Sequence, residues 1–243
     1  MPSSSERLND VAERFVAELI ERERSIEAVV LFGSVARGTA AEDSDIDLLV
    51  VPRRRLSGRA LKASVAFGSK PHLAVTSRTW DSLNELRNLD WSFVMHLAAE
   101  GRVLYDPGDA IPAALAVSPP TSAVIADEIR RAGVRLDQFD NLAPYGGHYL
   151  HVFAHIYRIT KAAAMLACIR AGVEEYDRGR ALACVGHVYP GTAETVALLG
   201  RLEPFYLRTE ARGADLPWSP TGARRQIVDA LEAVRHLVAV TSE

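Results

Sequence analysis

The sequence has little cysteine, no long hydrophobic run and no large excess of charge of either sign. It contains two cysteines, Cys168 and Cys184, which form no CxxC pair, so a disulfide framework or a zinc site is not expected. No apolar run approaches the roughly 20 residues of a membrane span, and residues 1–14 lack the apolar core of a signal peptide. The net charge of −3 argues against nucleic acid as a partner held by bulk charge. We therefore expect a cytoplasmic protein with no membrane partner.

The composition and length are those of a folded protein. Hydrophobic residues make up 48% and charged residues 24% of the chain, which excludes disorder as the main state. At about 100–200 residues per domain, 243 residues form one large or two small domains. The clearest break is the segment 116–121, where Pro119 and Pro120 cannot continue a helix. We expect two domains, at residues 1–116 and 121–243.

The two parts of the chain differ in hydrophobic pattern. In the first part, apolar residues recur at helical spacing over 8–20, and short apolar runs predict strands. These strands are expected at 26–32, 45–51, 71–76 and 101–105, with further helices at 80–87 and 91–100. In the second part, the pattern predicts helices at 121–141, 147–171, 178–187, 192–208 and 221–240. The sequence thus predicts an α/β domain followed by a helical bundle.

One stretch of the first domain has residues suited to phosphate chemistry. A predicted buried strand ends in Gly33-Ser34 at the start of a helix, where glycine lets a phosphate approach the backbone and the helix N-terminus offers N–H donors. Asp45 and Asp47 follow on the next strand, and a period of two puts both side chains on one face. Two carboxylates beside a phosphate site suit Mg²⁺ held between the protein and a nucleoside triphosphate. The arrangement indicates phosphoryl or nucleotidyl transfer.

Each half of this pattern also has an ordinary interpretation. A Gly-Ser before a helix is usually only a turn, and an Asp-x-Asp is usually only the start of a strand. No Lys-Ser or Lys-Thr follows the glycines, so the stretch is not a Walker phosphate loop. The combined order of strand, Gly-Ser, helix and acidic strand is what favours a functional site.

At these residues the chain resembles the nucleotidyltransferase superfamily of DNA polymerase beta. The family pattern reads Gly-Ser, then Ala-Arg-Gly, then Ser-Asp-x-Asp-Leu, and this chain has it at 33–34, 36–38 and 44–48. The resemblance is closest to the minimal and the aminoglycoside nucleotidyltransferases. It implies an α+β fold, in which a small mixed sheet is flanked by helices, followed here by an all-α helical bundle.

The resemblance also implies roles for individual residues. Gly33 and Ser34 would hold the triphosphate of ATP or another nucleoside triphosphate. Asp45 and Asp47 would bind Mg²⁺. Arg37 would lie near the phosphates or pair with an acidic neighbour.

The chain departs from the family pattern at the third carboxylate. The family places this acid on a following strand, as a metal ligand and often as the general base. The matching segment here is Lys70-Pro71-His72-Leu73-Ala74-Val75-Thr76, and His72 stands where the acid is expected. An imidazole can act as a base near neutral pH but binds Mg²⁺ less well than a carboxylate does. His72 replaces the base, or the helical domain supplies one, or the enzyme is impaired.

The helical domain contributes further candidates. His148, His151 and His155 are spaced to lie on one helix face, and we expect them on the wall of an acceptor site between the two domains. Asp137 and Asp140 are acids that could supply a base. The bundle resembles the HEPN group of helical domains, although the Arg-to-His spacing that ends at His187 is a weak match to the ribonuclease motif of that group.

We therefore expect a nucleotidyltransferase that moves NMP, with AMP as the first choice, from NTP to a hydroxyl group. The preferred acceptor is a small molecule such as an aminoglycoside. Two alternatives remain open, namely an enzyme that modifies a protein and a catalytically impaired module that binds nucleotides.

Overall fold

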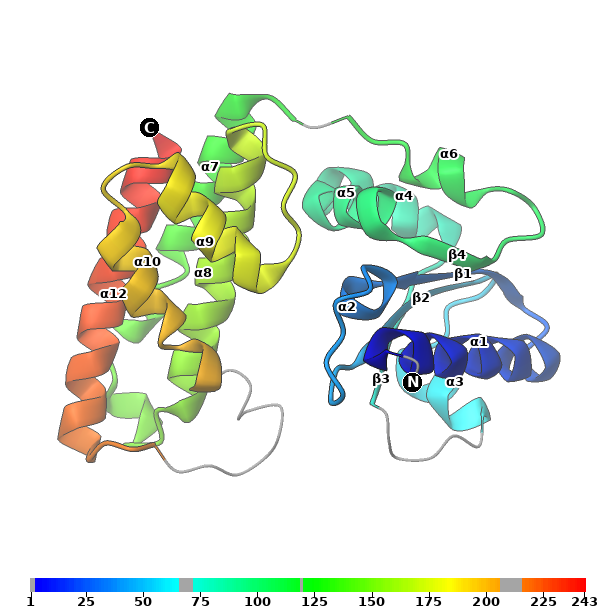
Figure 1. Ribbon diagram of the computed structural model, residues 1–243, viewed down its shortest axis with the longest axis horizontal. Helices are drawn as coiled ribbons and strands as arrows, with labels where there is room; N and C mark the ends of the chain where they lie inside the picture. The colour runs from blue at the N-terminus through cyan, green and yellow to red at the C-terminus, as the bar shows by residue number, and fades with distance from the viewer. Residues whose placement is uncertain (1–2, 66–71, 119, 206–215) are drawn as a thin grey trace. The chain divides into compact units, whose positions relative to one another are not determined.

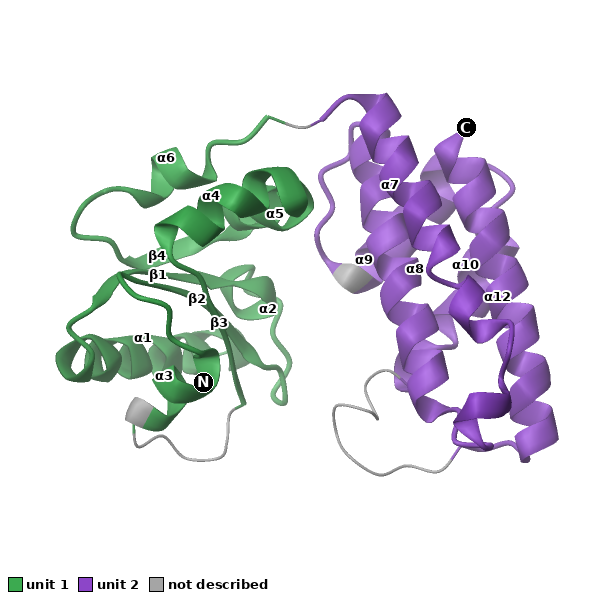
Figure 2. Cartoon of the chain, turned by 180° about the vertical axis from the view of Figure 1, so that it is seen from behind, with its two compact units in different colours: residues 1–119 green, residues 120–243 purple. Residues whose placement is uncertain are grey.

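The computed structural model describes residues 3–65, 72–118, 120–205 and 216–243 (Figure 1). The chain forms two compact units, residues 1–119 and 120–243 (Figure 2).

The first unit is built on a four-stranded mixed sheet with the strand order β3-β2-β1-β4. Its strands are β1 (Ile26–Phe32), β2 (Ile46–Pro52), β3 (Leu73–Ser77) and β4 (Arg102–Tyr105). Strand β1 is antiparallel to both β2 and β4, whereas β2 and β3 are parallel. This sheet and its flanking helices confirm the predicted α+β class.

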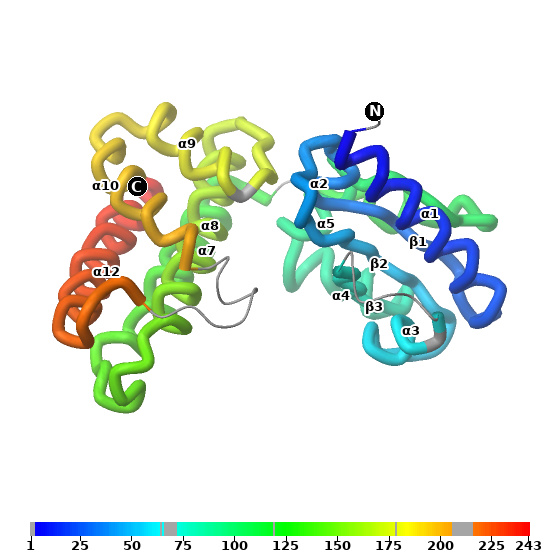
Figure 3. The backbone as a smooth tube through the Cα atoms, turned by 60° about the horizontal axis from the view of Figure 1, so that its bottom comes forward, coloured from blue at the N-terminus to red at the C-terminus, as the bar shows by residue number. Residues whose placement is uncertain are grey.

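Helices cover both faces of the sheet, which explains why β1 and β2 are apolar almost throughout (Figures 1 and 3). Helices α1 (Ser4–Arg22) and α3 (Gly58–Ser64) share one hydrophobic core with alternate strand residues such as Leu31 and Leu48. Helices α4 (Trp80–Leu89), α5 (Trp91–Glu100) and α6 (Ile111–Leu115) share a second core with the intervening residues, including Val30 and Leu49.

The second unit is helical, as the sequence pattern predicts. It contains α7 (Ser122–Val134), α8 (Leu150–Arg170), α9 (Arg178–Val188), α10 (Ala193–Gly200) and α12 (Pro220–Ser242). Helix α8 packs against α7, α9 and α12. Within the described residues, α8 alone is long and apolar enough to cross a membrane, but 72% of its apolar window is buried inside the structure. That burial is typical of the core helix of a bundle.

Several element boundaries differ from the predicted ones for local reasons. The helix expected over 121–141 ends at Val134 and is followed by a 3₁₀ turn at Asp137–Phe139. The helix expected from residue 147 begins at Leu150, since Gly146 and Gly147 have positive φ angles of 55° and 91°. The helix expected over 192–208 is shorter, ending as α10 at Gly200, and residues 206–208 lie outside the described part of the chain.

Helices α3 and α6 were not predicted because each is too short to show a helical period. The two strand predictions nearest the candidate site are shifted by one or two residues. Strand β2 begins at Ile46, after Asp45, and β3 begins at Leu73, after His72. Pro71 lies outside the described residues.

Candidate active site

The turn that follows β1 brings the Gly-Ser motif to the end of the sheet. Gly33 has a φ of 74° and opens the single-turn helix α2 (Gly33–Ala36). Gly38 has a φ of 76°, and its N–H donates to the carbonyl oxygen of Val35 at 3.1 Å. The Thr39 N–H donates to the carbonyl oxygen of Ser34 at 2.9 Å. The two glycines therefore allow a compact turn with Ser34 near its start.

The carboxylate of Asp47 lies directly against this turn. Asp47 pairs with Phe32 across β2 and β1, so it stands beside the residue that precedes Gly33. A Cβ atom placed on Gly33 would lie only 2.3 Å from Asp47 Oδ2. Glycine is therefore required at position 33 for two reasons, its backbone conformation and the close approach of an acidic side chain.

We predict that Gly33→Ala and Gly38→Ala will separate the effect of the backbone conformation from the effect of the close approach of Asp47. Both changes place a Cβ at positive φ, which costs about 1–2 kcal/mol of stability. No heavy atom lies within 4 Å of the Cβ position at Gly38, whereas at Gly33 the Asp47 carboxylate must turn away. We expect urea unfolding to show similar losses of stability and nucleotidyl transfer to fall about 10²-fold in Gly33→Ala only. Equal activity in the two variants would contradict the proposed importance of this contact.

The other carboxylate, Asp45, lies next to His72. Each residue stands just before its strand, and the Ile46 N–H donates to the carbonyl oxygen of His72 at 2.9 Å. His72 Nδ1 is 3.3 Å from Asp45 Oδ1, and the two side chains are 64% and 44% exposed. The structure therefore brings the predicted residues Asp45 and His72 together at the beginning of the parallel strands.

The strand register identifies a position that the sequence pattern did not. Asp47 pairs with Ala74 across β2 and β3, so the β3 residue beside Asp47 is Ala74, and His72 lies beside Asp45. Ala74 also sits between two apolar residues, Leu73 and Val75, which is the setting expected for the third carboxylate. Within the described ranges, no three His, Cys, Asp or Glu side chains gather closely enough to hold a metal ion.

Arg37 pairs with an acidic neighbour, which is one of the two arrangements expected for it. Its Nη1 is 2.6 Å from Glu100 Oε2, and the two side chains are only 13% and 14% exposed. His96 Nε2 lies 2.9 Å from the same oxygen. The His96 ring also packs edge-on against Phe32, with ring centroids 5.8 Å apart. This charged cluster connects the turn after β1 to helix α5, and the sequence pattern did not reveal Glu100 or His96.

We predict that Glu100→Gln will lower stability much more than Glu27→Gln. Removing one member of a largely buried ion pair leaves the other charge without compensation, at a cost of about 3 kcal/mol. The Glu27 carboxylate pairs with Arg53, whose side chain is 78% exposed, and such pairs contribute about 0–1 kcal/mol. Urea unfolding of the two variants is the measurement. Similar losses would show that the Arg37 pair contributes nothing beyond an ordinary surface pair.

The helical unit places its candidate residues on the surface or in other contacts. His148, His151 and His155 are exposed, and the His155 ring lies 6.1 Å from that of Phe139. Their position on the wall of an acceptor site stays a prediction.

The acids expected as alternative bases are held by an arginine of α12. Arg235 Nη2 lies 2.7 Å from Asp140 Oδ1 and 3.2 Å from Asp137 Oδ1. The hydrogen bond to Asp140, followed by that to Asp137, raises the pKa of the Arg235 guanidinium. The two carboxylates are therefore both engaged in ion pairs with Arg235.

The two cysteines lie where α8 and α9 pack together. Cys168 is fully buried and Cys184 is partly buried, and both are free thiols. Burial, followed by hydrogen bonding to Cys184, raises the pKa of the Cys168 thiol. The Cys168 thiol is therefore protonated at neutral pH and serves as a packing residue rather than a nucleophile.

Comparisons with known proteins support the fold and the family of this chain. Residues 15–109 match the family model described as "Polymerase beta, Nucleotidyltransferase". A curated relative named "Putative protein adenylyltransferase", from Methanocaldococcus jannaschii, is 36% identical over 85 residues, which cover 33% of this chain and 79% of the relative. The crystal structure of spectinomycin adenyltransferase AAD(9) from Enterococcus faecialis with ATP and spectinomycin is similar in fold. That likeness has a TM-score of 0.50 at 12% identity and covers 93% of this chain and 99% of the other.

The fold and the sequence relationship together define an enzyme that transfers a nucleotidyl group from a nucleoside triphosphate. The chain belongs to the polymerase beta nucleotidyltransferase family. The resemblance of its helical unit to HEPN domains stays a prediction.

Proposed function

We propose that this enzyme transfers AMP from ATP to a hydroxyl group of a small acceptor and releases pyrophosphate. The observation that carries the proposal is the contact between the Asp47 carboxylate and Gly33, where a Cβ atom would lie 2.3 Å from Asp47 Oδ2. It places an acidic side chain at the turn that has the glycine and hydroxyl residues suited to a triphosphate. Asp45, Asp47, Gly33 and Ser34 are the residues we assign to the site.

Asp45 and Asp47 fit Mg²⁺ by their donor chemistry. Both are carboxylates, which are the hard oxygen ligands that Mg²⁺ prefers, and two protein carboxylates with substrate phosphates form a common set of ligands. Asp45 and Asp47 are both partly exposed, so neither carboxylate is sealed off from solvent. When bound, Mg²⁺ would offset the negative charge that develops on the triphosphate.

The residues of this chain would then bind the phosphates and move a proton. The Ser34 hydroxyl and the N–H groups of its turn would donate to phosphate oxygens. The acceptor hydroxyl oxygen would form a bond to the α-phosphorus while the bond from that phosphorus to pyrophosphate breaks. We assign His72 as the base that takes the hydroxyl proton, since its side chain is exposed and its Nδ1 lies 3.3 Å from Oδ1 of the proposed metal ligand Asp45. Asp137 and Asp140 are less suitable because both pair with Arg235.

The helical unit supports our choice of acceptor class. This unit belongs to the same chain, so the enzyme has its own candidate for an acceptor-binding domain, and a small hydroxylated amine such as an aminoglycoside is the preferred acceptor. The likeness in fold to the spectinomycin adenyltransferase extends over 93% of this chain and so includes the helical unit. We expect the reaction to take place in the cytoplasm, with no membrane or nucleic acid as partner.

The test is incubation of the full chain with ATP labelled on the α-phosphate, Mg²⁺ and a panel of aminoglycosides, nucleosides and proteins. We expect pyrophosphate release and label on one class of acceptor, with neither when EDTA removes Mg²⁺. Asp47→Asn serves as the inactive control. If the protein binds Mg·ATP but releases no pyrophosphate with any acceptor, it is a nucleotide-binding module and the proposal is wrong.

A protein acceptor is the second candidate. It is favoured by the relative with 36% identity, whose name describes a protein adenylyltransferase. The same incubation separates the two candidates, because the label migrates with a protein band in one case and with a small molecule in the other.

A further inference from the structure

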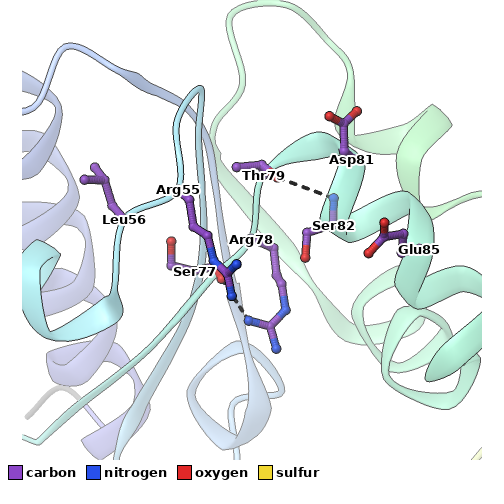
Figure 4. A pocket seen from close by; sticks show the side chains of 8 residues that line it. All are labelled: Arg55, Leu56, Ser77, Arg78, Thr79, Asp81, Ser82 and Glu85. Atoms are coloured by element: carbon purple, nitrogen blue, oxygen red, sulfur yellow. Dashed lines mark hydrogen bonds between the residues drawn. The ribbon is translucent and has the colours of Figure 1, made fainter.

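The first unit contains a second candidate binding site at the far end of β2 and β3. A pocket of about 270 Å³ opens where these parallel strands end and helix α4 begins (Figure 4). The residues that line it are Arg55, Leu56, Ser77, Arg78, Thr79, Asp81, Ser82 and Glu85. Apart from Leu56, every one of these residues is polar or charged.

Two arginines reach the same pocket from different segments. Arg55 follows β2 and Arg78 follows β3, and Figure 4 shows both side chains directed toward the same part of the pocket. Arg78 Nη1 donates to the carbonyl oxygen of Ser77 at 3.0 Å. An ion pair requires a distance of at most 4.0 Å between nitrogen and oxygen. Among the residues that the structure describes, no carboxylate oxygen lies that close to the guanidinium group of Arg55 or of Arg78. Two cations close together repel each other, and an anion that contacts both of them removes that repulsion.

Other groups of the pocket favour an anion of limited size. Ser77, Thr79 and Ser82 bring hydroxyl groups, and the Thr79 hydroxyl caps α4 by accepting from the Ser82 N–H at 3.4 Å. The positive end of the ten-residue helix α4 also faces this region. Asp81 and Glu85 line the pocket as well, so the formal charge of its lining sums to zero. The pocket therefore favours one small anionic group at the two guanidinium groups over an extended polyanion such as a nucleic acid.

We propose that this pocket binds a small molecule through a single phosphate or carboxylate group, held by Arg55 and Arg78. Both groups accept two hydrogen bonds from a guanidinium, which explains why arginine suits them. The pocket is distinct from the candidate active site. Asp47 lies near the beginning of β2, and the pocket residue Ser77 pairs with Val50, three residues or about 10 Å further along the strand. None of the residues that line the pocket is assigned to the candidate active site. The inference therefore stands independently of the proposed function.

Inorganic phosphate is the probe for the test, titrated calorimetrically into the full chain at low ionic strength. We expect Arg55→Gln and Arg78→Gln each to weaken phosphate binding about tenfold or more, because each removes charged hydrogen bonds. Arg59→Gln is the matched control, since Arg59 is an exposed arginine of the neighbouring helix α3 outside the pocket lining. Arg55 is exposed, so Arg55→Gln is expected to keep the fold, which thermal unfolding checks.

Three results would overturn the proposal. The first is that the wild-type protein does not bind phosphate. The second is that Arg55→Gln and Arg59→Gln weaken phosphate binding equally. The third is that Ser34→Ala abolishes phosphate binding whereas Arg55→Gln leaves it unchanged. The last result would assign the phosphate to the candidate active site.

A competition with acetate distinguishes a pocket for phosphate groups from one that also takes carboxylate groups. If acetate displaces phosphate, the pocket also accepts carboxylates, and if it does not, the pocket selects phosphoryl groups; either result supports an oxyanion site.

Discussion

Asp47→Asn is expected to lower nucleotidyl transfer by about 10²- to 10³-fold or more while leaving the fold unchanged. An amide is a weak ligand for Mg²⁺, so the variant loses the several kcal/mol of charge stabilisation that a bound metal provides. Asn has nearly the shape of Asp and can pack in the same position against Gly33. The measurements are pyrophosphate release under saturating ATP and a thermal unfolding curve of each protein.

The matched control is Asp43→Asn. Asp43 is an exposed acid two residues before Asp45, so the variant makes the same change of charge in the same segment, and it should keep full activity. Retained turnover in Asp47→Asn would remove this residue from the reaction. A loss in both variants would indicate a general effect of charge rather than a ligand role.

His72→Ala is expected to lower the rate by about 10²- to 10⁴-fold, which is the usual contribution of a general base. His72→Asp should preserve or raise activity if position 72 is a metal-ligand position that has changed, because its side chain would stand beside Asp45. His236→Ala, which removes an exposed histidine of α12, is the control. Transfer rates at saturating ATP are the measurement. If both His72 variants match the wild-type enzyme, the base must be sought in the helical unit.

The strand register suggests one more variant for the same experiment. Ala74 pairs with Asp47, so Ala74→Asp places a third carboxylate beside Asp47, one of the two proposed Mg²⁺ ligands. A higher rate in Ala74→Asp and no effect of His72→Asp would identify position 74 as the place of the missing acid. The reverse result would assign that place to position 72.

The sequence by itself determined most of the longer elements of this protein and their order. The strand β1 follows from a short, β-branched apolar run, and the helices α5 and α8 follow from apolar stretches too long for a strand. The close spacing of Asp45 and Asp47 and the glycines at 33 and 38 could also be read directly. The mixed sheet was predicted because those residues resemble the pattern of the nucleotidyltransferase family.

Only the tertiary structure decided which side chains meet. Glu100 is 63 residues from Arg37, and Arg235 is 95 residues from Asp140, so no local pattern could pair them. The register that places Ala74 beside Asp47, and His72 beside Asp45, depends on how β3 packs against β2. Such contacts depend on long-range packing, where the shape and charge of distant segments select the partner, and local periodicity carries no record of that choice.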